Sequence, residues 1–269
     1  MGDVIACANQ KGGVGKTTTV INLATYLALL GRRVLVIDLD PQGNATSGLG
    51  FDRATAQTSV YPALVEGVSA RALVQPTQVD GLWLIPSGRD LAGAEVELVQ
   101  MADRERKLRD ALDDLRASFD FVLLDCPPAV GLLTVNALTA ADAVLVPIQC
   151  EYYALEGLSQ LLSTIDMVRD NLNPRLRLAG VLLTMFDART TLSADVASEV
   201  RRHLGQSVFR TVVPRSVRLA EAPSYGRPIA RYSPESRGAH AYRALADEVV
   251  EREAGAPLHI QIQSAAISA

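Results

Sequence analysis

The sequence lacks an uninterrupted apolar run near the 18 or so residues that cross a lipid bilayer. Its 269 residues also begin without a charged leader and apolar segment, and Ala6 occupies a position where an N-myristoylation signal needs serine or threonine. We therefore expect a cytoplasmic protein without a membrane partner.

Cysteine is scarce, with three residues in the chain. Cys7, Cys126 and Cys150 form no C-x-x-C pair and have no nearby histidine ligand set, and each lies in or beside an apolar run typical of a buried strand. We expect them to be small buried side chains.

A glycine-rich loop is present at residues 9–18, Asn-Gln-Lys-Gly-Gly-Val-Gly-Lys-Thr-Thr. It lies between an apolar run at 4–8 and an amphipathic stretch at 18–30. In a strand, loop and helix of this order, backbone N–H groups surround phosphate oxygens and the positive end of the helix dipole points at the anion. The pattern therefore predicts a phosphate-binding loop.

Two lysines in this loop have different expected roles. Lys16 would reach the β- and γ-phosphates, and the Thr17 hydroxyl would bind Mg²⁺. Gln10 stands at the first glycine of the usual G-x-x-x-x-G-K-[ST] pattern, and Lys11 follows it. The sequence thus places a second cation beside the phosphates.

Apolar, β-rich runs alternate with helical patterns along the chain. The apolar runs cover 33–39, 82–86, 121–124, 143–148, 178–185 and 208–213, and the helical patterns cover 103–116, 155–172, 192–204 and 239–251. Strands separated by helices predict an α/β fold with a doubly wound, mostly parallel sheet and helices on both faces. Together with the phosphate-binding loop, this pattern predicts a P-loop NTPase. We expect one domain at 1–253 and a mobile tail at 254–269.

Acidic residues follow two of the apolar runs, at the sheet edge where ligands bind in such folds. Asp40 is placed to orient or deprotonate an attacking water, with Asp38 supporting it through hydrogen bonds. Asp125 is placed to hold Mg²⁺, through water. The alternatives are a helix-cap or turn role for Asp38 and Asp40, and an ordinary strand-end aspartate for Asp125.

The net charge of −4 hides an uneven distribution. Residues 169–243 contain 13 arginines and 6 acidic residues, whereas the rest of the chain has 13 basic and 24 acidic residues. The arginine-rich segment therefore holds half of the positive charge in about a quarter of the chain.

Several motifs together resemble the ParA/Soj chromosome-partitioning ATPases. They are Lys-Gly-Gly-Val-Gly-Lys-Thr-Thr at 11–18, Asp-Leu-Asp-Pro-Gln-Gly-Asn at 38–44, Leu-Leu-Asp-Cys-Pro-Pro at 123–128, Glu-Tyr-Tyr-Ala-Leu-Glu-Gly at 151–157 and Arg-Leu-Ala-Glu-Ala-Pro-Ser at 218–224. The resemblance covers nearly the whole chain, residues 4–252. It implies a deviant Walker A ATPase that forms a homodimer around two ATP molecules.

The resemblance also implies roles for individual residues. Lys11 would reach across to the phosphates bound by the partner subunit, whereas Lys16 would contact the phosphates bound by its own subunit. Asp40 would be the catalytic carboxylate, and Asp125 would be the Walker B acid. The phosphates and Mg²⁺ would be bound by Lys11, Gly12, Gly13, Val14, Gly15, Lys16, Thr17 and Thr18. The segment with Pro214 and Ser216 would pack near adenine, although Ser216 stands where many relatives have asparagine. Spacing alone does not choose ATP over GTP, but the N-K-x-D guanine motif is not evident.

The family's ATP-bound dimers bind DNA without sequence preference, which suits the arginine-rich segment. Arg189, Arg215 and Arg218 are the main candidates, with Arg227 and Arg231 behind them. The alternative is a solvated basic face or ion pairing with acidic helices. Hydrolysis would be weak until DNA and a ParB/Spo0J-type centromere-binding partner activate it, and the protein would associate with the nucleoid.

Three other functions share this nucleotide chemistry. A MinD-type membrane-positioning ATPase needs a basic amphipathic C-terminal helix, but residues 257–263 alternate with period two and contain no lysine or arginine. An iron–sulfur reductase of the nitrogenase Fe-protein type bridges a cluster between cysteines of two subunits, and Cys126 and Cys150 do not occur in the sequence setting of those cysteines. A small-molecule kinase or ligase stays open, because nothing near the loop identifies or rules out an acceptor.

Overall fold

The computed structural model describes residues 2–52, 58–151 and 154–254. Within them, one eight-stranded sheet has the order β3-β4-β2-β5-β1-β6-β7-β8. In that order the strands are β3 (Gln75–Pro76), β4 (Leu82–Ile85), β2 (Val34–Asp38), β5 (Phe121–Asp125), β1 (Asp3–Cys7), β6 (Ala143–Gln149), β7 (Arg177–Phe186) and β8 (Val208–Pro214). β3 is antiparallel to β4 and the other neighbours are parallel, which confirms the predicted mostly parallel sheet.

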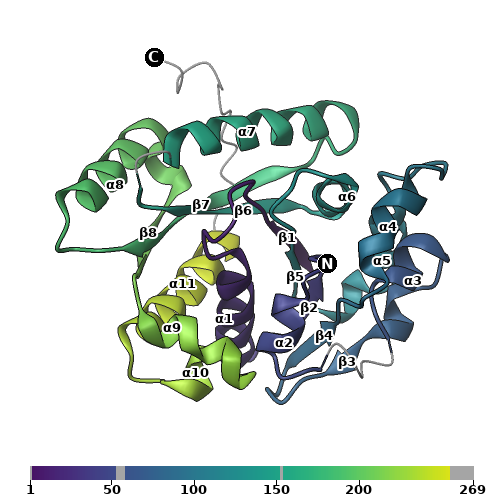
Figure 1. The fold of residues 1–269 in the computed structure, drawn as a ribbon, viewed down its shortest axis with the longest axis horizontal. Coiled ribbons are helices and arrows are strands. Elements are labelled where there is room, and N and C mark those ends of the chain that lie inside the picture. The colour runs from purple at the N-terminus through teal and green to yellow at the C-terminus, as the bar shows by residue number, and fades with distance from the viewer. Residues whose placement is uncertain (1, 53–57, 152–153, 255–269) are drawn as a thin grey trace.

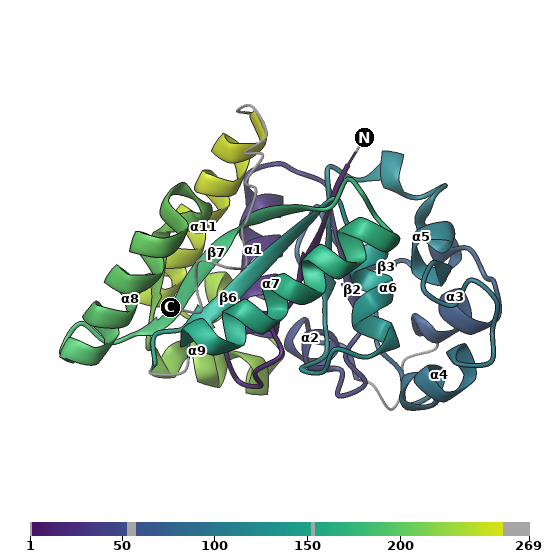
Figure 2. The ribbon, with the colours of Figure 1, turned by 90° about the horizontal axis from the view of Figure 1, so that it is seen from above.

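Helices cover both faces of the sheet (Figure 1). One face carries α1 (Lys16–Leu29), α2 (Asn44–Gly48), α9 (Val217–Glu221), α10 (Ile229–Tyr232) and α11 (Arg237–Ala254). The other carries α3 (Tyr61–Val65), α4 (Leu91–Leu98), α5 (Lys107–Leu112), α6 (Leu132–Ala140), α7 (Ala154–Asn171) and α8 (Thr191–Leu204). Short 3₁₀ helices lie at Ala70–Leu73, Arg116–Ser118, Gly205–Ser207 and Ala222–Tyr225. Figure 2 looks onto the second face, where α7 lies over β6.

The central strands are apolar on both sides because helices bury both faces. Each residue of β2 and β5 is buried. In the parallel register, Asp125 lies beside Cys7 on β1 and beside Asp38 on β2. The sheet thus brings the glycine-rich loop after β1 next to the two acidic strand ends.

The predicted strands are all present, with ends that differ by at most one residue. The helix predicted at 103–116 is wrong in extent: α5 covers only Lys107–Leu112, and Asp103 has a positive φ of 51°. α6 was not predicted, because it is buried nearly all round and therefore has no amphipathic period. The predicted tail at 254–269 falls, apart from its first residue, outside the described residues.

The three cysteines are buried and free, as predicted. Burial and the charge of the neighbouring Asp125 carboxylate raise the pKa of the Cys126 thiol. No helix in the described ranges is long and apolar enough to cross a membrane.

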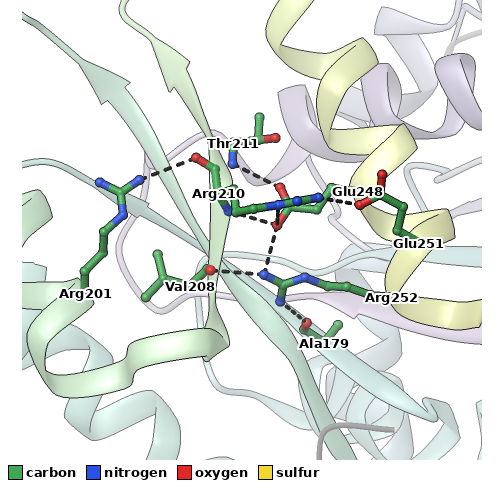
Figure 3. A network of polar contacts seen from close by, with 8 residues as sticks. All are labelled: Ala179, Arg201, Val208, Arg210, Thr211, Glu248, Glu251 and Arg252. Carbon is green, nitrogen blue, oxygen red and sulfur yellow. Dashed lines mark hydrogen bonds and ion pairs between the residues drawn. The ribbon is translucent and has the colours of Figure 1, made fainter. Parts of the chain in front are cut away.

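Edge strand β8 is fastened to α11 by Glu248 (Figure 3). Its carboxylate accepts the backbone N–H groups of Arg210 at 2.8 Å and Thr211 at 3.0 Å, and Arg252 donates to it at 2.9 Å. These N–H groups lie where the register between β7 and β8 shifts, so α11 satisfies donors that strand β7 leaves unpaired. These contacts, which we call the Glu248 clamp, hold the strand that ends at Pro214.

Candidate functional site

The glycine-rich loop begins at the end of β1 and continues into α1. Gly13 and Gly15 have φ values of +76° and +90°, a left-handed conformation that favours glycine. The Thr184 hydroxyl on β7 donates to the carbonyl oxygen of Val14 at 2.8 Å, which holds the loop from the side. The N-terminal turn of α1 therefore opens next to a loop in a fixed shape.

A cavity of about 560 Å³ lies over this loop. Its lining consists of Gly12, Gly13, Gly15, Lys16, Thr17, Thr18, Ile21, Asp40, Gln42, Asn44, Ser47, Pro128, Met185, Pro223 and Ser224. Loop residues and Asp40, predicted from separate motifs, thus lie around one space. The predicted phosphate-binding residues and the carboxylate-bearing Asp40 therefore border the same cavity.

The two loop lysines lie in different surroundings. Lys16 is 7% exposed, and its Nζ donates to the Lys11 carbonyl oxygen at 3.4 Å. Lys11 is exposed; its backbone N–H donates to Asn9 Oδ1 at 3.0 Å, and its Nζ lies 3.3 Å from Glu151 Oε2. Lys16 is thus folded over the loop, whereas Lys11 lies at the surface.

Three buried carboxylates meet at this edge of the sheet, from Asp38, Asp40 and Asp125. Burial raises the pKa of Asp38 to about 6, against the effect of hydrogen bonds from Thr46. Burial and the charge of Asp38 raise the pKa of Asp125 well above its ordinary value. A cation bound among these carboxylates would favour their charged forms.

Asp125 fits the predicted magnesium site. Both of its carboxylate oxygens are buried without a hydrogen-bond partner of normal geometry among the described residues. The Thr17 hydroxyl is close enough to lower its pKa. No group of three or more His, Cys, Asp or Glu side chains able to hold a metal occurs in the described ranges, but Mg²⁺ bound with phosphates needs only one or two protein carboxylates.

A second cavity of about 360 Å³ adjoins the first, and both are lined by Gly15, Thr18 and Met185. Its remaining lining residues are Thr184, Val213, Pro214, Arg215, Ser216, Val217, Leu219, Ala220 and Tyr242. The predicted adenine segment with Pro214 and Ser216 therefore borders a space beside the phosphate loop. Apolar walls and a few hydroxyls suit a flat base.

The arginines predicted for DNA lie at one edge of the sheet. Phe186 at the end of β7 pairs with Pro214 at the end of β8, which brings the loops with Arg189 and Arg215 together, and α9 with Arg218 follows. The side chains of Arg189 and Arg218 are 86% and 60% exposed.

Two of these arginines also have acidic partners. Arg189 pairs with Asp187 at 2.7 Å, and Arg218 pairs with Glu221 at 3.0 Å. The Arg189 guanidinium lowers the pKa of Asp187. The exposed arginines predicted for DNA are thus present, and so is the ion pairing with acidic residues that the sequence left open as an alternative role. Arg227 and Arg231 are exposed further along the chain.

Some residues around the site were not predicted. Thr46 and Ser87 are fully buried and hydrogen-bond to the segment with Asp38 and Asp40. Met185 lines both cavities with an unusual φ of 49°. Thr46 lies on α2, Ser87 follows β4 and Met185 lies on β7, so no motif spacing indicates that these residues meet at the site.

Comparisons with known proteins identify relatives that match most of the chain. A family model described as "AAA domain" matches residues 2–178. The chain is 54% identical to the sporulation initiation inhibitor protein Soj of Bacillus subtilis over 249 residues, 93% of this chain and 98% of that protein. It is 58% identical to the chromosome-partitioning ATPase Soj of Thermus thermophilus, over 92% of this chain and 95% of that protein.

A solved structure is similar as well. It is named cobyrinic acid a,c-diamide synthase from Mycobacterium smegmatis and contains ADP and magnesium. The TM-score is 0.83 at 42% sequence identity, with 95% of this chain and 96% of that chain covered.

Proposed function

Because the chain belongs to the Soj/ParA family of chromosome-partitioning ATPases, we propose that it is an ATP-dependent DNA-segregation switch. The ATP-bound homodimer binds double-stranded DNA without sequence preference. A ParB/Spo0J-type partner then stimulates hydrolysis, the dimer separates, and the protein leaves the DNA. Repeated cycles move chromosome or plasmid origins over the nucleoid.

The observation that carries this proposal is the arrangement around the larger cavity. A glycine-rich loop with two lysines faces Asp40, and the unpaired carboxylate of Asp125 lies beside Thr17. The bound ADP and magnesium of the similar Mycobacterium smegmatis structure support ATP and Mg²⁺ as the ligands here. Thr17 and Asp125 would hold Mg²⁺, which would neutralise phosphate charge.

The chain's own residues divide the remaining work. The loop N–H groups and Lys16 bind the phosphates of the same subunit. Asp40 orients the attacking water and accepts its proton. Lys11, at the surface, extends to the phosphates held by the second subunit, so dimer formation adds a cation where negative charge develops.

Nucleotide-dependent dimerisation tests this proposal. Sedimentation velocity with a non-hydrolysable ATP analogue should give a dimer, and ADP should give a monomer. Lys11→Ala should bind the analogue yet stay monomeric, whereas Lys107→Ala, on α5, should dimerise like the wild type. A dimer that forms equally with ADP would contradict the switch.

The name of the Mycobacterium smegmatis structure favours a second candidate, an enzyme that acts on a small molecule. Such an enzyme would release ADP faster when its acceptor is added. The relatives of 54% and 58% identity are named as Soj proteins, which is why we place partitioning first.

A further inference from the structure

We propose that Thr46 and Ser87 are positioning residues for Asp40. With Asp38 they form a buried set of hydrogen bonds that fixes the backbone of Asp40 on both sides. The inference rests on the proposed ATPase function, in which Asp40 orients the attacking water. Neither Thr46 nor Ser87 is among the residues that line the cavity, so both would act through Asp40.

Asp38 is the first part of this set. It ends β2 and is fully buried. Its Oδ1 accepts the backbone N–H of Asp40 at 3.1 Å. Its Oδ2 accepts the backbone N–H of Thr46 at 2.8 Å and the Thr46 hydroxyl at 2.6 Å. Three donors from two segments hold the carboxylate in one orientation.

Ser87 closes the set from the loop after β4. Its backbone N–H donates to Thr46 Oγ1 at 2.9 Å, so the threonine hydroxyl donates to Asp38 and accepts from Ser87. The Ser87 hydroxyl donates to the carbonyl oxygen of Asp40 at 2.7 Å. Thr46 and Ser87 are both fully buried. Water therefore does not compete for these bonds.

The result is a strongly restrained Asp40. Its N–H is held by Asp38, and its carbonyl oxygen accepts from the Ser87 hydroxyl and from the backbone N–H of Gly43 at 2.8 Å. Its carboxylate Oδ1 accepts the N–H of Gln42 at 2.9 Å. Since both peptide groups of Asp40 are anchored, its side chain enters the cavity from a fixed point. Supporting bonds of this kind keep a reacting group within the narrow range that catalysis needs.

The test compares hydrolysis with nucleotide binding in single variants. Ser87→Ala removes one donor to the Asp40 carbonyl and leaves the Ser87 N–H in place. We expect the single-turnover rate of ATP hydrolysis to fall about tenfold, since small misplacements of catalytic groups have large effects on rate, with the Kd for ATP unchanged. Thr46→Val should also lower the hydrolysis rate. Thr46→Ser, which keeps the hydroxyl, should hydrolyse ATP at the wild-type rate.

Ser59→Ala is the matched control. Ser59 is also buried at 6% exposure, but its hydroxyl donates to Asp90 and has no bond to Asp40. Its loss should leave the hydrolysis rate unchanged. Equal rate losses in Ser59→Ala and Ser87→Ala would mean a general effect on the fold and would overturn the proposal.

A double variant separates positioning from structure. In the Asp40→Ala background, Ser87→Ala should cause no further loss of the residual rate, measured with γ-labelled ATP, because the group it positions is gone. The same fold-loss in both backgrounds, or a wild-type rate in Ser87→Ala alone, would overturn the positioning role. A wild-type rate in Asp40→Ala would instead contradict the role of Asp40 in the proposed function. If Thr46→Val does not fold, the serine variants still decide the question.

Discussion

At the scale of single residues, the environment of each loop lysine suits its proposed role. Lys16 is buried and hydrogen-bonded to its own loop. Lys11 and Glu151 form an exposed pair, with side chains 43% and 47% accessible. Such a pair contributes about 0–1 kcal/mol, so Lys11 can leave Glu151 at little cost when a second phosphate site approaches.

We expect Asp40→Ala and Lys16→Ala to fail in different ways. Asp40→Ala should keep ATP and accumulate as a dimer on DNA, because water is no longer oriented while the phosphates stay bound. Its hydrolysis rate should fall by about 10² to 10⁴, the usual contribution of general base catalysis. Lys16→Ala should lose nucleotide binding, measured by isothermal titration calorimetry. Identical dimerisation of the two variants would contradict these assignments.

The residue types at the site were predictable only where one segment carries them. The spacing within residues 9–18 identified Lys16 and Thr17, and a strand-end position identified Asp125. The bond from Ser87 to Asp40 joins residues 47 positions apart, in the loops after β4 and β2. No local pattern specifies such a bond, because it depends on the order in which strands pair.

At the scale of elements, the edge strand β8 depends on α11. Glu248 is 3% exposed and bonds two N–H groups of β8, while Arg252 bonds the carbonyl oxygens of Val208 and Ala179 (Figure 3). The guanidinium also lies 4.1 Å from the centre of the Phe209 ring. The clamp fixes the strand whose end borders the second cavity.

Loss of this clamp should lower stability. Glu248→Gln removes the negative charge that Arg252 and the two N–H groups face, and a hydrogen bond to a charged group contributes about 1.5–3 kcal/mol. Denaturant unfolding should measure this loss. Glu251→Gln is the control, because its pair with Arg210 is exposed and should contribute less than about 1 kcal/mol.

The same clamp predicts a pH dependence. Burial acts to raise the pKa of Glu248, but hydrogen bonds from Arg210 and Thr211 and the charge of Arg252 outweigh it, so the pKa is lowered. A carboxylate with a lowered pKa contributes its full stabilisation above the pKa of the unfolded state, about 4.3. This contribution is lost as pH falls through the pKa of the folded state. Below about pH 4.3, the wild type should therefore lose stability more steeply than Glu248→Gln. Parallel curves would contradict this.

Element prediction succeeded for buried strands and long amphipathic helices. Short helices such as α2 and α3 have too few residues for a period to appear, and α6 lacks a polar face. β3 has only two residues and includes Pro76, which an edge position tolerates. These elements are specified by tertiary packing rather than by local pattern.

At the scale of the whole molecule, positive charge is concentrated in residues 169–243. Arg189, Arg215 and Arg218 lie just beyond the ends of β7 and β8, and Arg215 lines the second cavity. Because this edge also borders the proposed nucleotide site, ATP-dependent dimerisation would bring two such groups together. A dimer doubles a weak patch and multiplies its affinity for a long polyanion.

Arg218→Glu should abolish DNA binding and leave dimerisation intact. Arg218 is exposed and held only by Glu221 and Tyr232 among its described partners, so its replacement should not disturb the core. Electrophoretic mobility shift and sedimentation velocity would measure the two properties. Arg71→Glu, at an exposed arginine on the acidic part of the chain, is the control. Loss of both properties in Arg218→Glu would mean that this residue supports the interface or fold.

Fluorescence anisotropy with a non-specific DNA duplex tests the central claim most directly. The titration is made with ATP, with ADP and without nucleotide, at two salt concentrations, because phosphate contacts release counterions and weaken as salt increases. The account predicts tight, salt-sensitive binding with ATP alone. Equal binding with ADP, or no binding with any nucleotide, would contradict a DNA-segregation switch.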